Sequence, residues 1–298
     1  MNRLILSFCM IAFFLDLFSG ATAQVAPRNY KEEIAAWDKE RLASLKSATG
    51  WVNLVGLFWL KPGENSFGSD PANALVYARP EFPARLGRFI LTEKEVIWKT
   101  ELGHAVLEKN KPFEQGTIFY LDSLRSLSLG YKTFRWSIIK REHLIGVRFR
   151  DLASPALDAL KKIDRFPVSR TWVLEAEFIP SLVPSITTTN ILGQSYQQPH
   201  PGKIRFTIEG KTYQLDVVDE GEPDEYHIVF GDATNGDETY ESGRFIDIPK
   251  PDANGKTTID FNKAYNPPCA FSEFSTCPIP SKANTLSISI LAGEKKVH

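Results

Sequence analysis

Most of the side chains suited to binding or catalysis lie between Gly231 and Cys277. This segment mixes carboxylates, amides and phenols with aromatic residues, a combination typical of loops at binding and catalytic clefts. Its polar side chains are Asp232, Thr234, Asn235, Asp237, Tyr240, Arg244, Asp247, Asp260, Asn262, Lys263, Tyr265 and Asn266. We therefore expect the functional site here, although the cluster around Asp232 also fits an ordinary turn whose side chains bond their own backbone.

Arg244 lies between Gly243 and Phe245 in a strand-like run, and a buried guanidinium needs an anionic partner. One interpretation pairs it with Asp232 or Asp260 as a structural ion pair. The other has it binding the carboxylate or phosphate of a small ligand, with Asp260 as a base or an orienting group. In that case the ligand also receives hydrogen bonds from Tyr240, Asn262, Tyr265 and Asn266. The same side chains equally suit the backbone of a proline-rich loop.

The five histidines are scattered, and no two have the spacing of metal ligands. We therefore expect no metal site, and the sequence implies no particular cofactor. His227 lies in a strand-like run close to Asp232, and it is a candidate acid or base together with Asp232 and Asp260. The alternative is a plain strand histidine. Standard nucleotide enzymes and α/β hydrolases are disfavoured, because the sequence lacks G-x-S-x-G, P-loop and G-x-G-x-x-G motifs.

The N-terminal residues predict a cleaved signal peptide. Arg3 precedes a mostly apolar run from Leu4 to Phe18, and Ala21-Thr22-Ala23 forms an A-x-A cleavage site. A membrane anchor would need roughly 20 apolar residues and a basic stop-transfer cluster. We expect cleavage after Ala23, a periplasmic or secreted protein, and no membrane span after cleavage.

Two cysteines, Cys269 and Cys277, remain after this cleavage. An even pair in an oxidising compartment is a disulfide candidate. Two free buried thiols are the first alternative, and thiol chemistry is the second.

The composition favours a mainly β protein. Aromatic residues, proline and glycine are frequent, as in folds built from short strands joined by many turns. The net charge is −1, which argues against nucleic acid as a partner, because many phosphates require a basic face. A small-molecule ligand is the partner that we expect, and the sequence does not determine the oligomeric state.

The hydrophobic pattern predicts one long helix followed by many short strands. The helix begins at Asn29, and Ile34, Trp37, Leu42 and Leu45 recur on one face. A short second helix is expected at 155–163. The predicted strands include 87–91, 95–100, 104–108, 117–121, 133–140, 143–151, 171–178, 186–192, 203–209, 212–218, 225–232 and 285–291.

Three stretches resemble a bacterial and archaeal family known only as domain of unknown function 1684. They are Gly50 to Leu60 with Gly63, Asn65 and Gly68; Gly243-Arg244-Phe245; and Asp260 to Phe271 with Thr276-Cys277-Pro278. The resemblance extends over nearly the whole mature chain. It implies no activity, ligand or catalytic residue, because the family has none established.

A weaker similarity concerns the run from Leu60 through Gly63 and Phe67-Gly68 to Leu75, which resembles the opening of a forkhead-associated β-sandwich. Such domains bind phosphothreonine through an arginine and a serine. Ser69 follows Gly68 here, where that pattern has arginine. The similarity therefore suggests sandwich topology without phosphopeptide binding.

Together these observations predict a β-sandwich, or two small antiparallel β-sheets, with one N-terminal amphipathic helix. The expected parts are a signal peptide at 1–23, a helix with a β meander at 24–178, and a C-terminal β region with the site at 179–298. Three functions stay open: binding of a small anionic or carbohydrate ligand, hydrolysis with Asp260, Asp232 or His227 as acid or base, and a structural or interaction role in the cell envelope.

Overall fold

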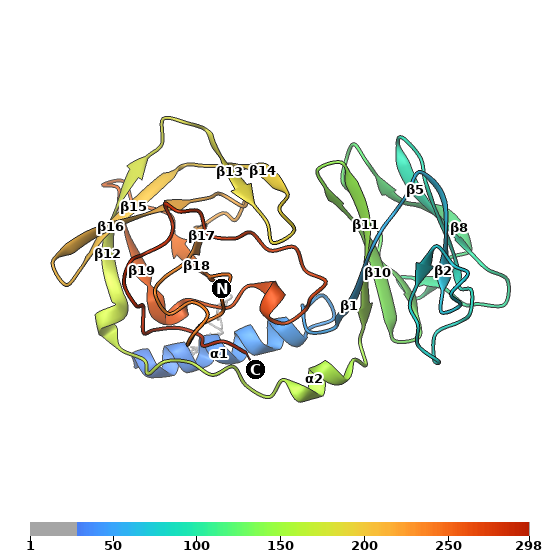
Figure 1. The fold of residues 1–298 in the computed structure, drawn as a ribbon, viewed down its shortest axis with the longest axis horizontal. Helices are drawn as coiled ribbons and strands as arrows, with labels where there is room; N and C mark the ends of the chain where they lie inside the picture. Colours follow the sequence, from blue (N-terminus) through green and yellow to red (C-terminus); the bar gives the residue numbers. More distant parts are fainter. Residues whose placement is uncertain (1–28, 298) are drawn as a thin grey trace, which may run out of the picture.

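The computed structural model describes residues 29–297, which form two halves lying side by side (Figure 1). The predicted signal peptide lies outside the described residues. Strands dominate both halves, and this confirms the mainly β prediction. Within residues 29–297, no helix has the length and apolar character needed to cross a membrane.

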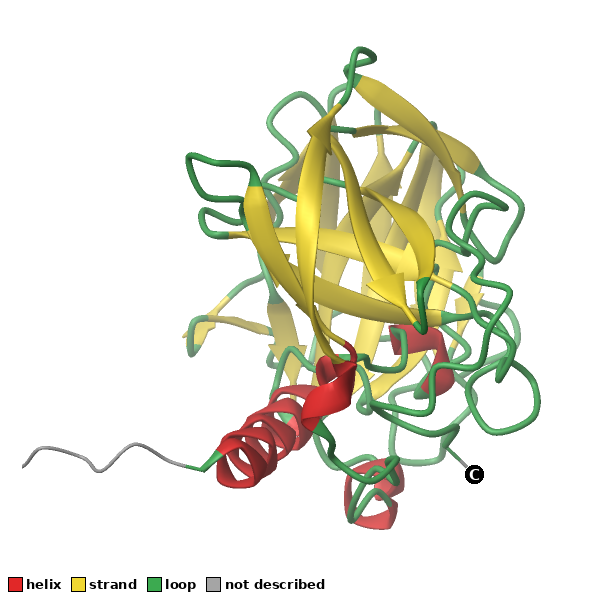
Figure 2. Cartoon of the chain, turned by 90° about the vertical axis from the view of Figure 1, so that its left-hand side faces the viewer, coloured by secondary structure: helices red, strands yellow, loops and turns green. Residues whose placement is uncertain are grey.

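The predicted N-terminal helix is present as α1 (Tyr30–Lys46). Asn29 and Glu32 form a capping box, in which each side chain accepts from the other residue's backbone N–H. Ile34 and Leu45 are buried. Although α1 precedes the first strand in the sequence, it lies beneath the C-terminal half (Figure 2) and contacts the 3-10 helix η2 (Phe261–Lys263).

The N-terminal half is a sandwich of two sheets. One sheet has the strand order β1 (Leu54–Trp59), β11 (Leu144–Asp151), β10 (Phe134–Arg141), β9 (Leu129–Tyr131), β6 (Leu107–Glu108) and β7 (Lys111–Pro112). The other has the order β3 (Leu75–Val76), β2 (Gly63–Gly68), β4 (Gly87–Leu91), β5 (Glu95–Thr100) and β8 (Gln115–Tyr120). Alternate residues point inward and enclose an aromatic core that includes Phe67, Trp98, Trp136 and Phe149. The forkhead-associated similarity stays a prediction.

The C-terminal half contains three smaller sheets. The largest has the order β16 (Lys211–Val217), β15 (Gly202–Ile208), β12 (Val173–Pro180) and β19 (Lys256–Asp260). The other two are the pairs β13 (Ser185–Thr189) with β14 (Ser195–Pro199), and β17 (Glu225–Phe230) with β18 (Arg244–Pro249). A second hydrophobic core fills the space between them and includes Phe206, Phe230, Ile246 and Phe261.

The chain passes between the two cores through α2 (Pro155–Ala159), which is shorter than the expected helix, and the 3-10 turn η1 (Arg170–Trp172). The expected boundary between residues 178 and 179 lies inside β12, which pairs with β15 and β19.

The predicted strand at 285–291 is absent. Leu286 and Ile290 are buried as the alternation suggested, but this segment contributes only a single bridge, Gly231 to Thr285. The apolar side chains of 285–291 pack into the core although the backbone that carries them is irregular. The burial of these side chains therefore does not require the strand pairing that was predicted.

Candidate functional site

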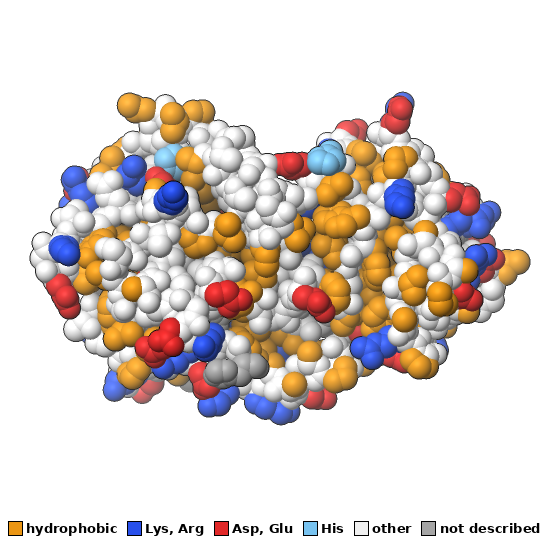
Figure 3. Space-filling view, in the orientation of Figure 1, with side chains coloured by type: hydrophobic (Ala, Val, Ile, Leu, Met, Phe, Trp, Pro, Cys, Tyr) orange, Lys and Arg blue, Asp and Glu red, His pale blue; other side chains and the backbone are white. Residues whose placement is uncertain are grey.

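The main candidate site is a pocket where the two halves meet. Its volume is about 570 Å³, within the range of small-molecule sites. The surface is hollowed between the halves (Figure 3). The C-terminal half contributes most of the lining, and the N-terminal half contributes Trp51, Lys140, Arg141 and Glu142.

A histidine and an aspartate face each other across the β17–β18 pair beside this pocket. His227 and Asp247 are directly opposite in the antiparallel register, which brings their side chains together. His227 Nδ1 lies 2.7 Å from Asp247 Oδ1, and the hydroxyl of Tyr265 donates to Asp247 Oδ2 at 2.8 Å. Paired backbone hydrogen bonds between Phe245 and Tyr265, both 2.8 Å, hold Tyr265 in place.

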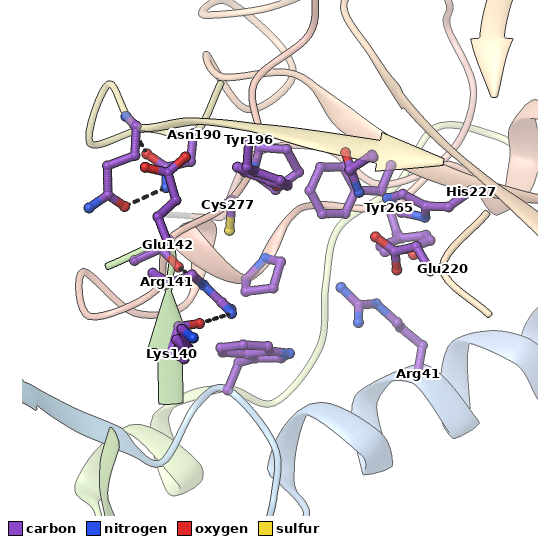
Figure 4. A pocket seen from close by; sticks show the side chains of 17 residues that line it. Arg41, Lys140, Arg141, Glu142, Asn190, Tyr196, Glu220, His227, Tyr265 and Cys277 are labelled. Carbon is purple, nitrogen blue, oxygen red and sulfur yellow. Dashed lines mark hydrogen bonds between the residues drawn. The ribbon is translucent and has the colours of Figure 1, made fainter. Parts of the chain in front are cut away.

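These contacts leave one nitrogen of the His227 ring for a ligand. With Nδ1–H donating to Asp247, Nε2 is the basic nitrogen, and it has no hydrogen-bond partner among residues 29–297. His227 lines the pocket, and Figure 4 places it beside Tyr265 and Glu220. The geometry is that of a general base held by a carboxylate.

The surroundings of His227 favour its protonated form. Burial by itself lowers the pKa of His227, but the hydrogen bond to Asp247 and the charges of Glu220 and Asp247 outweigh it, so the pKa is raised above its ordinary value. The hydroxyl of Tyr265 stays protonated, because burial first, and then Asp247, raise its pKa well above the usual value. Tyr265 therefore stays a hydrogen-bond donor.

Replacing Asp247 by Asn should lower the pKa of His227 below its ordinary value of about 6.5. The substitution removes the charge-assisted hydrogen bond and the charge of Asp247, and it leaves burial, which lowers the pKa by more than the remaining charge of Glu220 raises it. NMR titration of the ring signals measures the change. Glu220→Gln is the matched control and should lower the midpoint less, because Glu220 makes no hydrogen bond to the ring. An unchanged midpoint in Asp247→Asn would show that the carboxylate does not control His227.

Arg41 brings a positive charge from α1 to the same end of the pocket (Figure 4). Its Nε lies 3.3 Å from Glu294 Oε1, and its Nη2 donates to the carbonyl of Asn266 at 2.8 Å. The guanidinium stacks 4.5 Å from the centre of the Tyr265 ring. Nη1 has no partner in the described part of the chain. Arg41 is thus held in place with donors left for an anion.

Cys269 and Cys277 lie in contact near the pocket, and the structure leaves both thiols free. The backbone N–H of Cys269 donates to Cys277 Sγ at 3.0 Å. The hydrogen bond between the two thiols lowers the pKa of Cys269 and raises that of Cys277, and the Tyr240 hydroxyl also bonds Cys269. Cys277, which lines the pocket, is therefore a protonated thiol and a poor nucleophile. The disulfide stays a prediction.

Arg244 is a residue of the interior, and this corrects the expectation that it binds a ligand. Its guanidinium donates to Asp232 Oδ2 at 2.7 Å, and neither side chain has any exposed surface. It also donates to the carbonyls of Ala292 and Ile290. This arrangement is the structural ion pair with Asp232. Asp232 is buried to the same extent, so it cannot act as an acid or base on a ligand in the pocket.

Three other predicted site residues connect backbone segments instead of lining the pocket. Asp260 accepts from the hydroxyl of Tyr30 at 2.7 Å. Asn262 bonds the backbone of Ser169 through both amide atoms. Asn266 donates to the carbonyl of Lys295. Tyr240 does not line the pocket either, so His227 and Tyr265 are the two predicted catalytic or ligand-binding residues that do.

Several residues of the site are not recognisable from the sequence. Asp247 was noted only as part of the polar segment, and identifying β18 as the partner of β17 would have paired it with His227. Arg41, Trp51 and Arg141 carried no local signal, because they reach the pocket from distant elements. Among the described residues, no group of three or more His, Cys, Asp or Glu side chains is arranged to hold a metal ion.

Comparison with known proteins identifies the C-terminal part of the chain. Residues 158–295 match the family described as "Protein of unknown function (DUF1684)". We call residues 158–295, which match this family model, the DUF1684 region. The match confirms the family resemblance and corrects its extent, because it excludes the stretch from Gly50 to Gly68. The His227–Asp247–Tyr265 group lies inside the DUF1684 region, whereas Arg41 and Arg141 lie outside it.

Among the solved structures that are similar to part of this chain is the solution NMR structure of an uncharacterized protein from Haloarcula marismortui, with 25% identity and a TM-score of 0.40. The alignment covers 47% of this chain and 80% of that protein. No curated protein matches the sequence.

Proposed function

We propose that the protein is a hydrolase for a small organic molecule that binds between its two halves, with His227 as the general base. The observation that carries this proposal is the His227 ring, whose Nδ1 is bonded to Asp247 and whose Nε2 has no hydrogen-bond partner in the described part of the chain. A base held in one tautomer, close to a cation and inside a pocket of this volume, suits proton transfer to and from a reacting molecule.

The chemistry that fits these groups is hydrolysis of an ester by an activated water molecule. His227 Nε2 takes a proton from water while the oxygen of that water attacks the carbonyl carbon. The unpartnered donor of Arg41 stabilises the negative charge that develops on the carbonyl oxygen. The protonated His227 then gives its proton to the leaving alcohol as the carbon–oxygen bond breaks. Water is the nucleophile because the high pKa of the Cys277 thiol keeps it protonated.

We further propose that this reaction takes place in the periplasm or outside the cell. The support for this compartment is the N-terminal sequence alone, with its apolar run and its A-x-A cleavage site.

The pH dependence of turnover tests the assignment of the base. With 4-nitrophenyl esters of short acids as probes, we expect kcat/KM to rise with pH and to level off above a midpoint higher than about 6.5. The base works only when it is unprotonated, and the surroundings of His227 raise its pKa. A rate independent of pH, or one that falls as pH rises through this range, would exclude His227 as the base.

A carbohydrate-binding module is the second candidate. Gln198 Oε1 is buried without a hydrogen-bond partner, and Tyr196 lies beside it along β14 in the pocket wall. An acceptor in this position suits a hydroxyl group. A rise in melting temperature with neutral monosaccharides, together with no turnover of any ester, would favour this candidate over the hydrolase.

A further inference from the structure

Basic residues of the β10–β11 hairpin form the pocket wall opposite His227. Lys140 and Arg141 line it, and Figure 4 shows them across the pocket from Arg41 and His227. Arg141 donates only to uncharged groups, the Thr276 hydroxyl at 3.2 Å and the Lys140 carbonyl at 3.2 Å. Neither basic side chain forms an ion pair with a carboxylate of residues 29–297.

A third cation, Arg148, lies on the same face of the sheet as Arg141. The antiparallel register pairs Arg148 with Ser137. Ser137 and Arg141 are four residues apart in β10 and therefore share a face, so the side chains of Arg148 and Arg141 both lie on the outer face of the sheet. Arg148 stacks 4.7 Å from the centre of the Trp51 ring, and Trp51 lines the pocket. The Nε of Arg148 is buried and has no hydrogen-bond partner among residues 29–297.

This group has more positive charge than its surroundings neutralise. Burial, followed by the charges of Arg141 and Arg150, lowers the pKa of Arg148 to about 10, so Arg148 is still a cation at neutral pH. Glu142 also lines the pocket here, but within the described residues no ion pair joins it to these cations. Glu220 lies at the opposite end, where it acts on His227. An anion bound at this wall would relieve the repulsion and supply the missing partner.

We infer that the substrate carries an acidic group at the end remote from the hydrolysed bond, and that Arg141 and Lys140 bind this group, with the charge of Arg148 behind them adding to the attraction. The inference rests on the proposed hydrolase function and specifies its substrate class, a small ester that ends in a carboxylate or a phosphate. The reacting end lies against His227 and Arg41, which the C-terminal half and α1 position. The N-terminal sandwich thus supplies selectivity, and the molecule spans both halves.

Two esters of equal length test the inference. Mono-4-nitrophenyl glutarate ends in a carboxylate, and 4-nitrophenyl pentanoate ends in a methyl group. We expect kcat/KM of the wild-type protein to be at least about tenfold higher for the glutarate ester, as for a charge-assisted hydrogen bond. The double variant Lys140→Gln/Arg141→Gln should lose this preference through a higher KM. The loss should appear in KM for the glutarate ester and not in kcat.

The control variant is Arg135→Gln. Arg135 lies on the same face of β10, but it donates to the carbonyls of Lys132 and Phe134 and does not line the pocket. It should keep the preference for the glutarate ester. Competition by glutarate and by 4-phosphonobutyrate distinguishes a carboxylate from a phosphate as the preferred group. Circular dichroism melting curves establish that each variant is folded.

The outcomes separate this inference from the proposed function. Equal rates for the two esters, with the pH profile of a base, would overturn the acidic-end site and leave the hydrolase standing. If neither ester is hydrolysed, the hydrolase proposal fails. Calorimetry with glutarate and pentanoate then tests the acidic-end site by itself. The site is supported if the wild-type protein binds glutarate but not pentanoate and the double variant binds neither. Equal binding of the two compounds, or no binding of glutarate, would overturn it.

Discussion

Replacing His227 by Asn should lower kcat/KM by about 10²- to 10⁴-fold for any ester that the wild-type protein hydrolyses, the usual contribution of a general base. The Asn side chain can still donate to Asp247 from the position of Nδ1, but it has no atom in the place of Nε2. The loss should therefore fall on kcat, because the substitution removes the proton acceptor and leaves the rest of the pocket intact. Steady-state kinetics at a pH above the midpoint of the wild-type profile measures it.

His200 provides a matched control for this substitution. It is buried like His227, and its Nε2 lies 3.1 Å from a carboxylate oxygen of Asp216, yet it does not line the pocket. His200→Asn removes a buried histidine paired with an aspartate and should leave kcat/KM unchanged. A similar loss in both variants would point to a structural effect, and full activity in His227→Asn would exclude His227 as the base.

The local parts of the fold were predictable because local physics determines them. Asn29 and Glu32 satisfy the first backbone N–H groups of α1, and the hairpin turn at Gly210 joins β15 and β16 in register. The segment at 285–291 differs because alternating apolar residues report burial and do not report pairing. Leu286 and Ile290 are covered by neighbouring strands while their backbone bonds irregular segments.

The site was less predictable because its residues meet only through tertiary structure. In the sequence, Arg244 could equally be a ligand-binding arginine or part of a structural ion pair. Its complete burial against Asp232 is what identifies the structural role. His227 carried no motif, and its significance depends on the register that places Asp247 opposite it. Arg41 reaches the pocket because α1 packs under the half of the molecule that is farther along the chain.

The two halves of the molecule contribute different kinds of residue to the pocket. The groups that would perform the reaction come mostly from the DUF1684 region, and the basic wall comes from the sandwich that precedes it. In the function that we propose, reaction chemistry and substrate selection would therefore belong to separate cores. A change in the β10–β11 hairpin would then alter which molecule binds without disturbing the His227–Asp247 pair.

The second large effect expected is a loss of stability when the buried ion pair is broken. Asp232→Asn should lower the free energy of unfolding by about 3–5 kcal/mol, because Arg244 is left as an uncompensated charge without access to water. Asp232 Oδ1 also accepts from the backbone and hydroxyl of Thr234 and from the backbone of Ile290, so the neutral amide disturbs these bonds as well. Urea unfolding measures the difference.

The ion pair between Arg205 and Glu177 is the comparison that isolates burial. Its N–O distance is also 2.7 Å, but both side chains are exposed, and water replaces a lost partner there. Glu177→Gln should therefore change the unfolding free energy far less than Asp232→Asn. If the two substitutions cost the same, Arg244 must find another partner or water when Asp232 is neutralised, and the account of Arg244 as a locked interior cation would fail.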